Sequence, residues 1–236
     1  WLIGCQATGE ALLIDPERDI CRYLEIAEQA GLAITAVTET HIHADFLSGC
    51  CEFATSTKAR CYLSEHGGDD WSYTWPKQSG VPVTYVKDGD TFSIGNISVT
   101  VVHTPGHTPE HISFLIHDAN TAEPIGYATG DFVFVGVLGR PDLLETAAGL
   151  KGAMVASAQQ LHTTCQRFLE MEDYVQIWPS HGAGSSCGKA LGAVSQTTVG
   201  YEKRTSPPLQ YVGDEQAFVD FMLADQPEPP LYFARM

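Results

Sequence analysis

The sequence predicts an α+β protein in which two β-sheets are each covered by helices. Strand-like and helix-like segments alternate in the first 63 residues and again after residue 125. Between these two parts, residues 83–116 have a β pattern throughout. A parallel sheet wound with helices would alternate along the whole chain, so the uninterrupted β segment favours two sheets.

The first part of the chain has the pattern of four strands and two helices. The strands are short apolar runs bounded by turn residues, and they are expected at residues 2–4, 11–14, 32–37 and 59–63. Residues 20–30 place Ile20, Leu24 and Ala27 at helical spacing, and Gly31 ends the pattern. A second helix is expected at about residues 47–58.

The rest of the chain adds six expected strands and one long helix. The strands alternate with Asp-Gly and Gly-Asn turns, and they are expected at residues 83–86, 91–92, 97–102, 112–116, 125–129 and 175–178. The helix is expected at about residues 144–172, with a break near Gly149 or Gly152.

Length and composition are those of an ordinary folded domain. The 236 residues, 44% apolar and 18% charged, suit a single domain over residues 1–236. The net charge of −16 would repel phosphates, so neither nucleic acid nor an anionic membrane is an expected partner. No apolar run approaches the ~20 residues of a membrane span. The oligomeric state is left open, a homo-oligomer included.

The cysteines indicate a reducing compartment. There are seven, an odd number, and none forms a Cys-x-x-Cys pair. This pattern fits free thiols better than a disulfide framework, and it favours the cytoplasm. The chain begins at Trp1, so a preceding targeting peptide would not be visible.

Three potential metal ligands lie within five residues in the segment His41-Ile42-His43-Ala44-Asp45. Imidazole nitrogens and a carboxylate suit Zn, Fe, Ni or Mn. The segment directly follows the apolar strand expected at residues 32–37. One such histidine is usually structural, but three ligand types in one short loop indicate a metal site.

Three further candidate ligands also lie just past expected strand ends. His107 follows a Pro-Gly turn, Asp131 follows Gly130, and His181 follows Pro179-Ser180. Side chains that converge from loops at one edge of a rigid scaffold are what an active site needs. Taken singly, His103 and His117 favour a structural role, and His66 and His162 are expected at the surface.

Four motifs in this order resemble the metallo-β-lactamase superfamily. They are His-x-His-x-Asp at 41–45, Pro-Gly-His-Thr at 105–108, Gly-Asp at 130–131 and Ser-His-Gly at 180–182. Within it, residues 40–49, 129–131, 139–142 and 181–189 are similar to persulfide dioxygenases, especially the bacterial type joined to rhodanese domains. The resemblance implies a four-layer αβ/βα sandwich. It also implies that residues 226–236 begin a linker to a rhodanese domain, fused or as a separate partner.

The resemblance also assigns roles to the candidate residues. It implies one Fe(II) per chain, held by His41, His107 and Asp131, with Zn as a substitute. His43, Asp45 and His181, which bind metal in two-metal relatives, then surround the ligands without joining them. The family's last histidine of the first motif is Phe46 here, which argues for one metal.

Other features leave alternatives open. Glu110-His111 departs from the Gly that many relatives have after Thr-Pro, so the role of His111 is open. Cys187 can meet a persulfide or be a structural thiol. Arg140 is the candidate for binding the carboxylate of a glutathione-like carrier, and a salt bridge to Asp142 is its structural alternative.

The expected reaction is oxidation of a low-molecular-weight thiol persulfide by O₂ to sulfite and the thiol. Two histidines and a carboxylate on Fe(II) leave positions for a soft sulfur donor and for O₂. The carrier can be glutathione, coenzyme A or another thiol. The alternative is a zinc-dependent hydrolase of acyl-glutathione thioesters, similar to glyoxalase II. A non-enzymatic metal-binding module is a third class, against which the complete ligand set argues.

Overall fold

The computed structural model describes residues 1–69, 71–119, 121–182, 185–189 and 194–235, and two β-sheets lie face to face in it. The first sheet has the strand order β1-β2-β3-β4-β5. Its strands are Leu2–Cys5 (β1), Glu10–Ile14 (β2), Ala33–Thr38 (β3), Arg60–Ser64 (β4) and Val83–Val86 (β5). Strands β2 to β5 are parallel to one another, and β1 pairs antiparallel with β2.

The second sheet has the order β11-β10-β9-β8-β7-β6. Its strands are Thr91–Ile94 (β6), Ile97–His103 (β7), Ile112–His117 (β8), Pro124–Gly130 (β9), Gln176–Pro179 (β10) and Thr197–Thr198 (β11). Strands β6 to β9 form an antiparallel meander, whereas β10 runs parallel to β9. The continuous β pattern of residues 83–116 therefore belongs to two sheets, with β5 in the first and β6 to β8 in the second.

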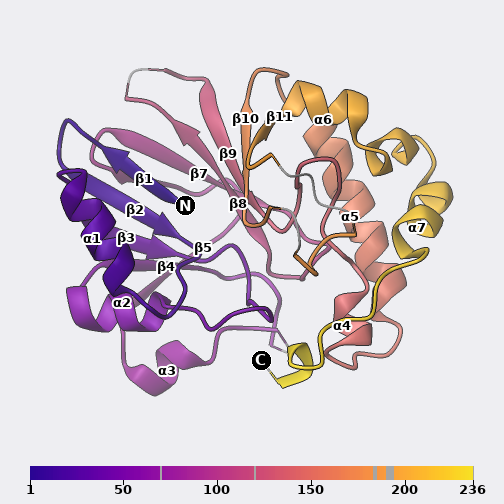
Figure 1. Ribbon diagram of the computed structural model, residues 1–236, viewed down its shortest axis with the longest axis horizontal. Helices are drawn as coiled ribbons and strands as arrows, with labels where there is room; N and C mark the ends of the chain where they lie inside the picture. The colour runs from indigo at the N-terminus through magenta and orange to yellow at the C-terminus, as the bar shows by residue number, and fades with distance from the viewer. Residues whose placement is uncertain (70, 120, 183–184, 190–193, 236) are drawn as a thin grey trace.

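Helices cover the outer face of each sheet (Figure 1). Those beside the first sheet are Cys21–Gln29 (α1), Cys50–Thr57 (α2) and Trp75–Ser79 (α3). Those beside the second are Leu143–Thr146 (α4), Ala153–Leu169 (α5), Val199–Thr205 (α6) and Glu215–Leu223 (α7). Two 3₁₀ turns, Pro208–Tyr211 (η1) and Phe233–Arg235 (η2), complete the described elements. This is the predicted four-layer αβ/βα sandwich.

Successive side chains of β2 pack alternately into two different apolar cores. Ala11 and Leu13 pack among the residues beneath the first helical layer, whereas Leu12 and Ile14 pack between the two sheets. Successive side chains of a strand point to opposite faces, so an apolar run of this kind suits a sheet that is covered on both sides. The apolar runs are therefore a consequence of the four layers.

The long helix expected at 144–172 is divided in two. Gly149 and Gly152 both have positive φ, +77° and +79°, which a helix does not accommodate. Helix α5 then buries Leu161, Cys165 and Phe168 against the second sheet. The break predicted near these glycines is confirmed.

Several elements of the structure were not expected from the sequence. Helices α3, α6 and α7 and the two-residue strand β11 have short or weak patterns, and α2 begins at Cys50, three residues later than expected. His162, expected at the surface, is instead buried in α5, with its Nε2 2.8 Å from the carbonyl oxygen of Val212. None of the helices formed by the described residues combines the length and apolar content that crossing a bilayer demands.

Candidate metal centre

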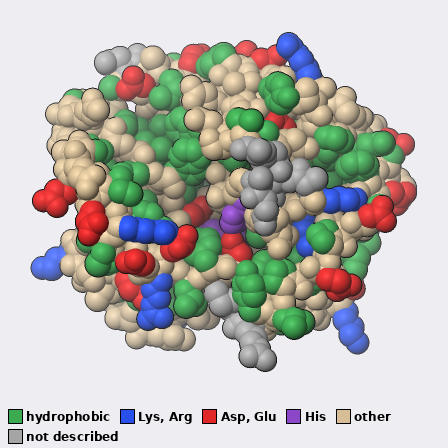
Figure 2. All heavy atoms as spheres, viewed as in Figure 1, with side chains coloured by type: hydrophobic (Ala, Val, Ile, Leu, Met, Phe, Trp, Pro, Cys, Tyr) green, Lys and Arg blue, Asp and Glu red, His purple; other side chains and the backbone are tan. Residues whose placement is uncertain are grey.

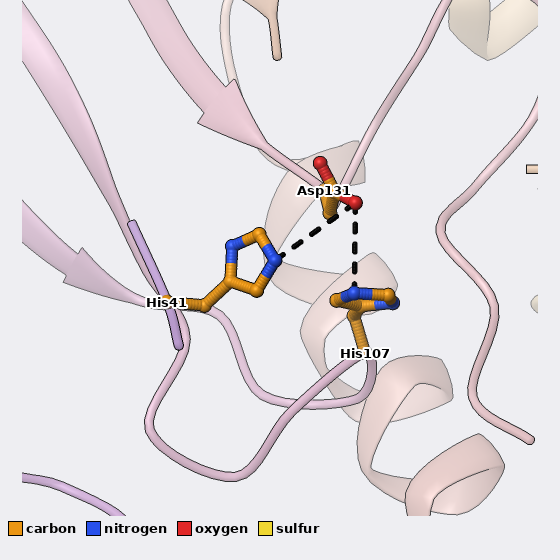
Figure 3. A group of neighbouring side chains, drawn as sticks. All are labelled: His41, His107 and Asp131. Atoms are coloured by element: carbon orange, nitrogen blue, oxygen red, sulfur yellow. Dashed lines mark ion pairs between the residues drawn. The ribbon is translucent and has the colours of Figure 1, made fainter. Parts of the chain in front are cut away.

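His41, His107 and Asp131 converge from three different strand ends (Figure 3). His41 follows β3 of the first sheet, whereas His107 and Asp131 follow β7 and β9 of the second. The Nε2 atoms of His41 and His107 lie 3.9 Å and 3.5 Å from Oδ2 of Asp131. One donor atom from each residue lies within 4.8 Å of the others, so the three can hold one metal ion.

Two glycines allow the loops to approach this closely. Gly130, directly before Asp131, has φ of +55°, and a Cβ there would lie 2.6 Å from Thr40 Oγ1. Gly106, directly before His107, has φ of +143°, and a Cβ there would lie 2.5 Å from Cβ of Leu161. Both positions combine a left-handed backbone with a lack of space, so each requires glycine.

Neighbouring groups orient the two histidine rings. Nδ1 of His107 lies 3.0 Å from the carbonyl oxygen of Arg140, which can only accept a hydrogen bond, so Nδ1 carries the proton. Nδ1 of His41 lies 2.9 Å from Oγ1 of Thr40. In both rings Nε2 is thereby left to face Asp131, and for His107 its lone pair is free for a metal.

Asp131 provides the strongest sign that a cation belongs here. The residue is fully buried, and neither carboxylate oxygen has a hydrogen-bond partner among the described residues. An ionised carboxylate that is buried without hydrogen bonds is unfavourable, and the nearby imidazole of His181 also contacts Asp45. A divalent cation bound by two imidazoles and this carboxylate would give both oxygens of Asp131 a strong partner, so the donor set fits Fe(II) or Zn(II).

The three residues expected around the ligands lie beside the cluster. Nε2 of His43 is 3.0 Å from Oδ1 of Asp15, while Nε2 of His181 is 3.1 Å from Oδ2 of Asp45 and 3.4 Å from Oδ1 of Asp131. These contacts make His43 and His181 partners of carboxylates. They form a second row of side chains behind the three proposed ligands.

A second group of possible donors is formed by Asp45, His181 and Cys187, whose donor atoms lie within 4.8 Å of one another. Cys187 is 2% exposed, and burial raises the pKa of its thiol well above the ordinary value. The thiol is therefore protonated at neutral pH in the absence of a metal. Residues 183 and 184 of the 181–189 motif lie outside the described residues.

The protonation states of the histidines differ in the metal-free protein. Burial, together with the neighbouring histidines, holds the pKa of His41 well below its ordinary value. Burial also disfavours protonation of His43 and His181, but Asp15 raises the pKa of His43 well above the ordinary value, and Asp131 and Asp45 raise that of His181 to about 9. His41 is thus a neutral donor, whereas His43 and His181 are cations paired with acids.

Asp15 was missed by sequence reasoning, although it organises the first motif. Its carboxylate accepts hydrogen bonds from Thr40 N at 2.7 Å, Thr40 Oγ1 at 2.9 Å and Ser180 Oγ at 3.0 Å, besides its contact with His43. Burial raises its pKa, but His43 and these donors outweigh burial and lower the value to about 2. The sequence feature that could have revealed Asp15 is its position directly after the buried strand β2, like the candidate ligands that follow other strands.

His111, whose role the sequence left open, positions Asp131. Its Nε2 accepts a hydrogen bond of 3.0 Å from the backbone N–H of Asp131. Its Nδ1 therefore carries the proton and donates to Oγ1 of Thr104 at 2.7 Å. Because Nε2 is already occupied, His111 fixes the backbone of a proposed ligand and is not itself one.

For Arg140, the structure favours the salt-bridge alternative over binding of a substrate carboxylate. Its side chain is 1% exposed, and Nε and Nη2 donate to the two carboxylate oxygens of Asp142 at 3.0 Å and 2.7 Å. Nη1 donates to the carbonyl oxygen of Ser186. Each guanidinium nitrogen therefore donates a hydrogen bond within the protein, as the salt-bridge alternative requires. The backbone carbonyl of Arg140 has a separate role, because it orients His107.

The fold and the site agree with a family match. The family model of the metallo-beta-lactamase superfamily matches residues 1–181, so the chain belongs to this superfamily. It is similar to the crystal structure of a metallo-beta-lactamase from Staphylococcus aureus, with 44% identity and a TM-score of 0.90 over 99% of this chain and 66% of that one. It is also similar to ETHE1 from Myxococcus xanthus, with 25% identity and a TM-score of 0.75 over 99% and 88% of the two chains.

Curated relatives include more than one activity. The mitochondrial persulfide dioxygenase ETHE1 of Bos taurus is 25% identical over 77% of this chain and 62% of its own length. A beta-lactamase hydrolase-like protein of Xylella fastidiosa is 27% identical over 93% of this chain, which spans 51% of that protein. A hydroxyacylglutathione hydrolase of Rhodospirillum rubrum is 34% identical over 63% of this chain and 52% of its own length. The chain therefore spans about half the length of the latter two relatives.

Proposed function

We propose that this protein is a mononuclear non-haem Fe(II) persulfide dioxygenase. The balanced reaction converts a thiol persulfide, O₂ and water into the thiol, sulfite and two protons. His41, His107 and Asp131 are the proposed iron ligands, with Zn as a substitute metal. The proposal is supported by the ligand set and by the similarity to the mitochondrial persulfide dioxygenase ETHE1 of Bos taurus.

The observation that carries the choice of one metal is Phe46. An imidazole at this position would offer a further nitrogen donor, whereas the phenyl ring offers none and lies with its centroid 4.2 Å from that of His43. His43 itself is committed to Asp15. A second cation beside Phe46 would therefore have one nitrogen donor fewer than in a relative with histidine at this position.

When bound, Fe(II) held by two imidazoles and one carboxylate would leave open positions for a sulfur donor and for O₂. The protein contributes orientation, since Arg140 O and His111 keep His107 and Asp131 in place. His181 lies 3.1 Å from Asp45 and 3.4 Å from Asp131, where its imidazole can carry a proton. From this position it could protonate the thiolate that is released when the S–S bond breaks.

A zinc-dependent thioester hydrolase is the second candidate. It is favoured by the donor group Asp45, His181 and Cys187 and by the similarity to hydroxyacylglutathione hydrolases. If that group held a second cation beside Asp131, the site would have the two metals that activate a hydroxide. The two candidates therefore differ in metal stoichiometry as well as in reaction.

One experiment separates the two candidates. Protein made with iron available and purified without oxygen is analysed for Fe and Zn. It is then assayed for O₂ uptake with the persulfides of glutathione and of coenzyme A, and for hydrolysis of S-lactoylglutathione. We expect about one Fe per chain and persulfide-dependent O₂ uptake. Two firmly bound zinc ions with thioester hydrolysis and no O₂ uptake would reject the dioxygenase.

The position of Phe46 can be tested directly in the same assays. Phe46→His restores a nitrogen donor, so its metal-to-protein ratio should rise toward two, with Phe46→Leu as the control that removes the ring without adding a donor. An unchanged ratio in Phe46→His would remove the main argument for one metal.

The expected rhodanese domain or partner, and the expected lack of nucleic-acid and membrane partners, remain predictions.

A further inference from the structure

A pocket of about 250 Å³ leads to the metal centre. His43, Asp45 and His107 belong to its lining, and we call it the site pocket. Its volume is slightly below the ~300–1,000 Å³ usual for small-molecule sites. It therefore holds a small ligand, or one arm of a larger one. Figure 2 shows histidine side chains near the middle of the face, with apolar and acidic side chains around them.

The walls of the site pocket are apolar and come from distant segments of the chain. They include Ile42 after β3, Trp71 before α3, Leu143 and Leu144 in α4, and Phe233 in η2. Phe233 is 5% exposed and packs with Leu143 in a small apolar cluster. Figure 1 shows the C-terminal turn between the helices of the two halves, where it can close this wall.

The charges around the site pocket do not suit an anionic arm. No lysine or arginine occurs among its described lining residues, and its one carboxylate is Asp45. His43, the cation in the lining, is already paired with Asp15, and Arg140 is paired with Asp142. Beyond the reach of the metal, a carboxylate entering this pocket would therefore lose water without gaining an unpaired cation.

Trp71, one of the lining residues, carries a neutral hydrogen-bond donor. Nε1 of Trp71 is buried and has no partner among the described residues. An indole N–H can only donate, and an unpaired buried donor is unfavourable. A carbonyl oxygen of a ligand amide would satisfy it without bringing a charge into the pocket.

We propose that the site pocket binds its persulfide through an uncharged arm that carries an amide carbonyl, and that charged parts of the carrier remain outside. This inference rests on the proposed function only for the identity of the reacting sulfur. It favours carriers of the pantetheine type, whose amides separate the sulfur from any charge. Glutathione carries its carboxylates close to the sulfur, so it is disfavoured.

Binding of unreactive thioethers tests the inference without turnover. N-acetyl-S-methylcysteamine and N-acetyl-S-methylcysteine share the amide and differ by one carboxylate. Equilibrium dialysis against the iron-loaded protein under nitrogen should show the neutral thioether binding roughly tenfold more tightly, because the carboxylate is desolvated without a partner. Equal or tighter binding of the carboxylated thioether, or no binding of either, would overturn the inference.

Variants at two wall residues, Ala148 and Trp71, test the inference residue by residue. Ala148, which lines the pocket and is exposed, accepts a longer side chain. Ala148→Arg should tighten binding of the carboxylated thioether, whereas Ala148→Gln, of similar length but uncharged, should not. Trp71→Phe should weaken the neutral thioether about 2- to 10-fold by removing one hydrogen bond. If neither Ala148→Arg nor Trp71→Phe changes binding, the thioethers bind elsewhere and the inference fails.

O₂ uptake with the persulfides of the same two arms separates this inference from the proposed function. Uptake with both, together with tighter binding of the carboxylated thioether, would reject the neutral arm and keep the dioxygenase. Tighter binding of the neutral thioether without O₂ uptake would reject the dioxygenase and keep the neutral arm. We expect both the binding preference and the uptake rate to favour the neutral arm.

Discussion

Removal of the Arg140 guanidinium should destabilise the protein more than it weakens substrate binding. The ion pair with Asp142 is buried, with side chains 1% and 5% exposed, and its two hydrogen bonds are 3.0 Å and 2.7 Å long. Arg140→Ala leaves the Asp142 carboxylate buried without its counter-charge, which typically costs ~3–5 kcal/mol. For a chain of this length, that loss corresponds to a fall of about 6–20 °C in Tm.

The assay is thermal unfolding of the chelated protein, so that loss of metal does not contribute. Arg204→Ala is the matched control, because Arg204 also pairs with an aspartate, Asp173, but its side chain is 78% exposed. An exposed pair contributes ~0–1 kcal/mol, so this control should hardly move Tm. In the double variant Arg140→Met, Asp142→Leu, no charge is left unpaired, and most of the lost stability should return.

Two results would refute this reasoning. If Arg140→Ala kept the parent Tm while KM for glutathione persulfide rose and iron content held, the guanidinium would bind substrate after all. If the double variant were as unstable as Arg140→Ala, the loss would come from packing and not from the unpaired carboxylate. The Arg140 side chain holds the backbone whose carbonyl contacts His107, through its bonds to Asp142 and Ser186, so we also expect a moderate loss of metal affinity in Arg140→Ala.

Metal content and pH dependence give further tests. His41→Ala should lose nearly all iron, whereas His43→Ala should keep part of it, with affinity lowered ~10- to 100-fold. Cys187→Ser should leave the ratio near one metal per chain if the Asp45 group holds none. Burial raises the pKa of Glu39 to about 8 from 4.5, so its contribution to stability is present below about pH 4.5 and is lost as pH rises to about 8. Glu39→Gln should therefore flatten the fall in Tm over this range.

Each of these tests has a clear contrary result. Equal loss of iron in His43→Ala and His41→Ala would make His43 a ligand. A ratio that falls from two to one in Cys187→Ser would place a second cation at Asp45, His181 and Cys187. Parallel Tm profiles for Glu39→Gln and the parent, measured after chelation, would show that Glu39 is ionised in the folded protein.

Local sequence patterns were sufficient for most strands, for α1 and for the break between α4 and α5. Strand β2 has an apolar run because both of its faces are buried. The break between the helices has a local cause, since Gly149 and Gly152 adopt positive φ angles that end a helix. Helix α3 has only five residues and β11 only two. Such short elements form because the rest of the fold holds them, so they carry little periodicity of their own.

The amino-acid sequence by itself determined where most strands lie along the chain, and it placed six candidate ligands just past strand ends. The resemblance to persulfide dioxygenases then implied His41, His107 and Asp131 among them. Only the tertiary structure decided which polar groups meet. Asp15 and His43 are 28 residues apart in the chain, and no local pattern links them. Arg140 is close in sequence both to Asp142 and to the proposed ligand Asp131. In the folded protein its guanidinium is buried and forms an ion pair with Asp142. A guanidinium removed from water requires a partner within hydrogen-bond distance, which is a property of packing and not of sequence spacing.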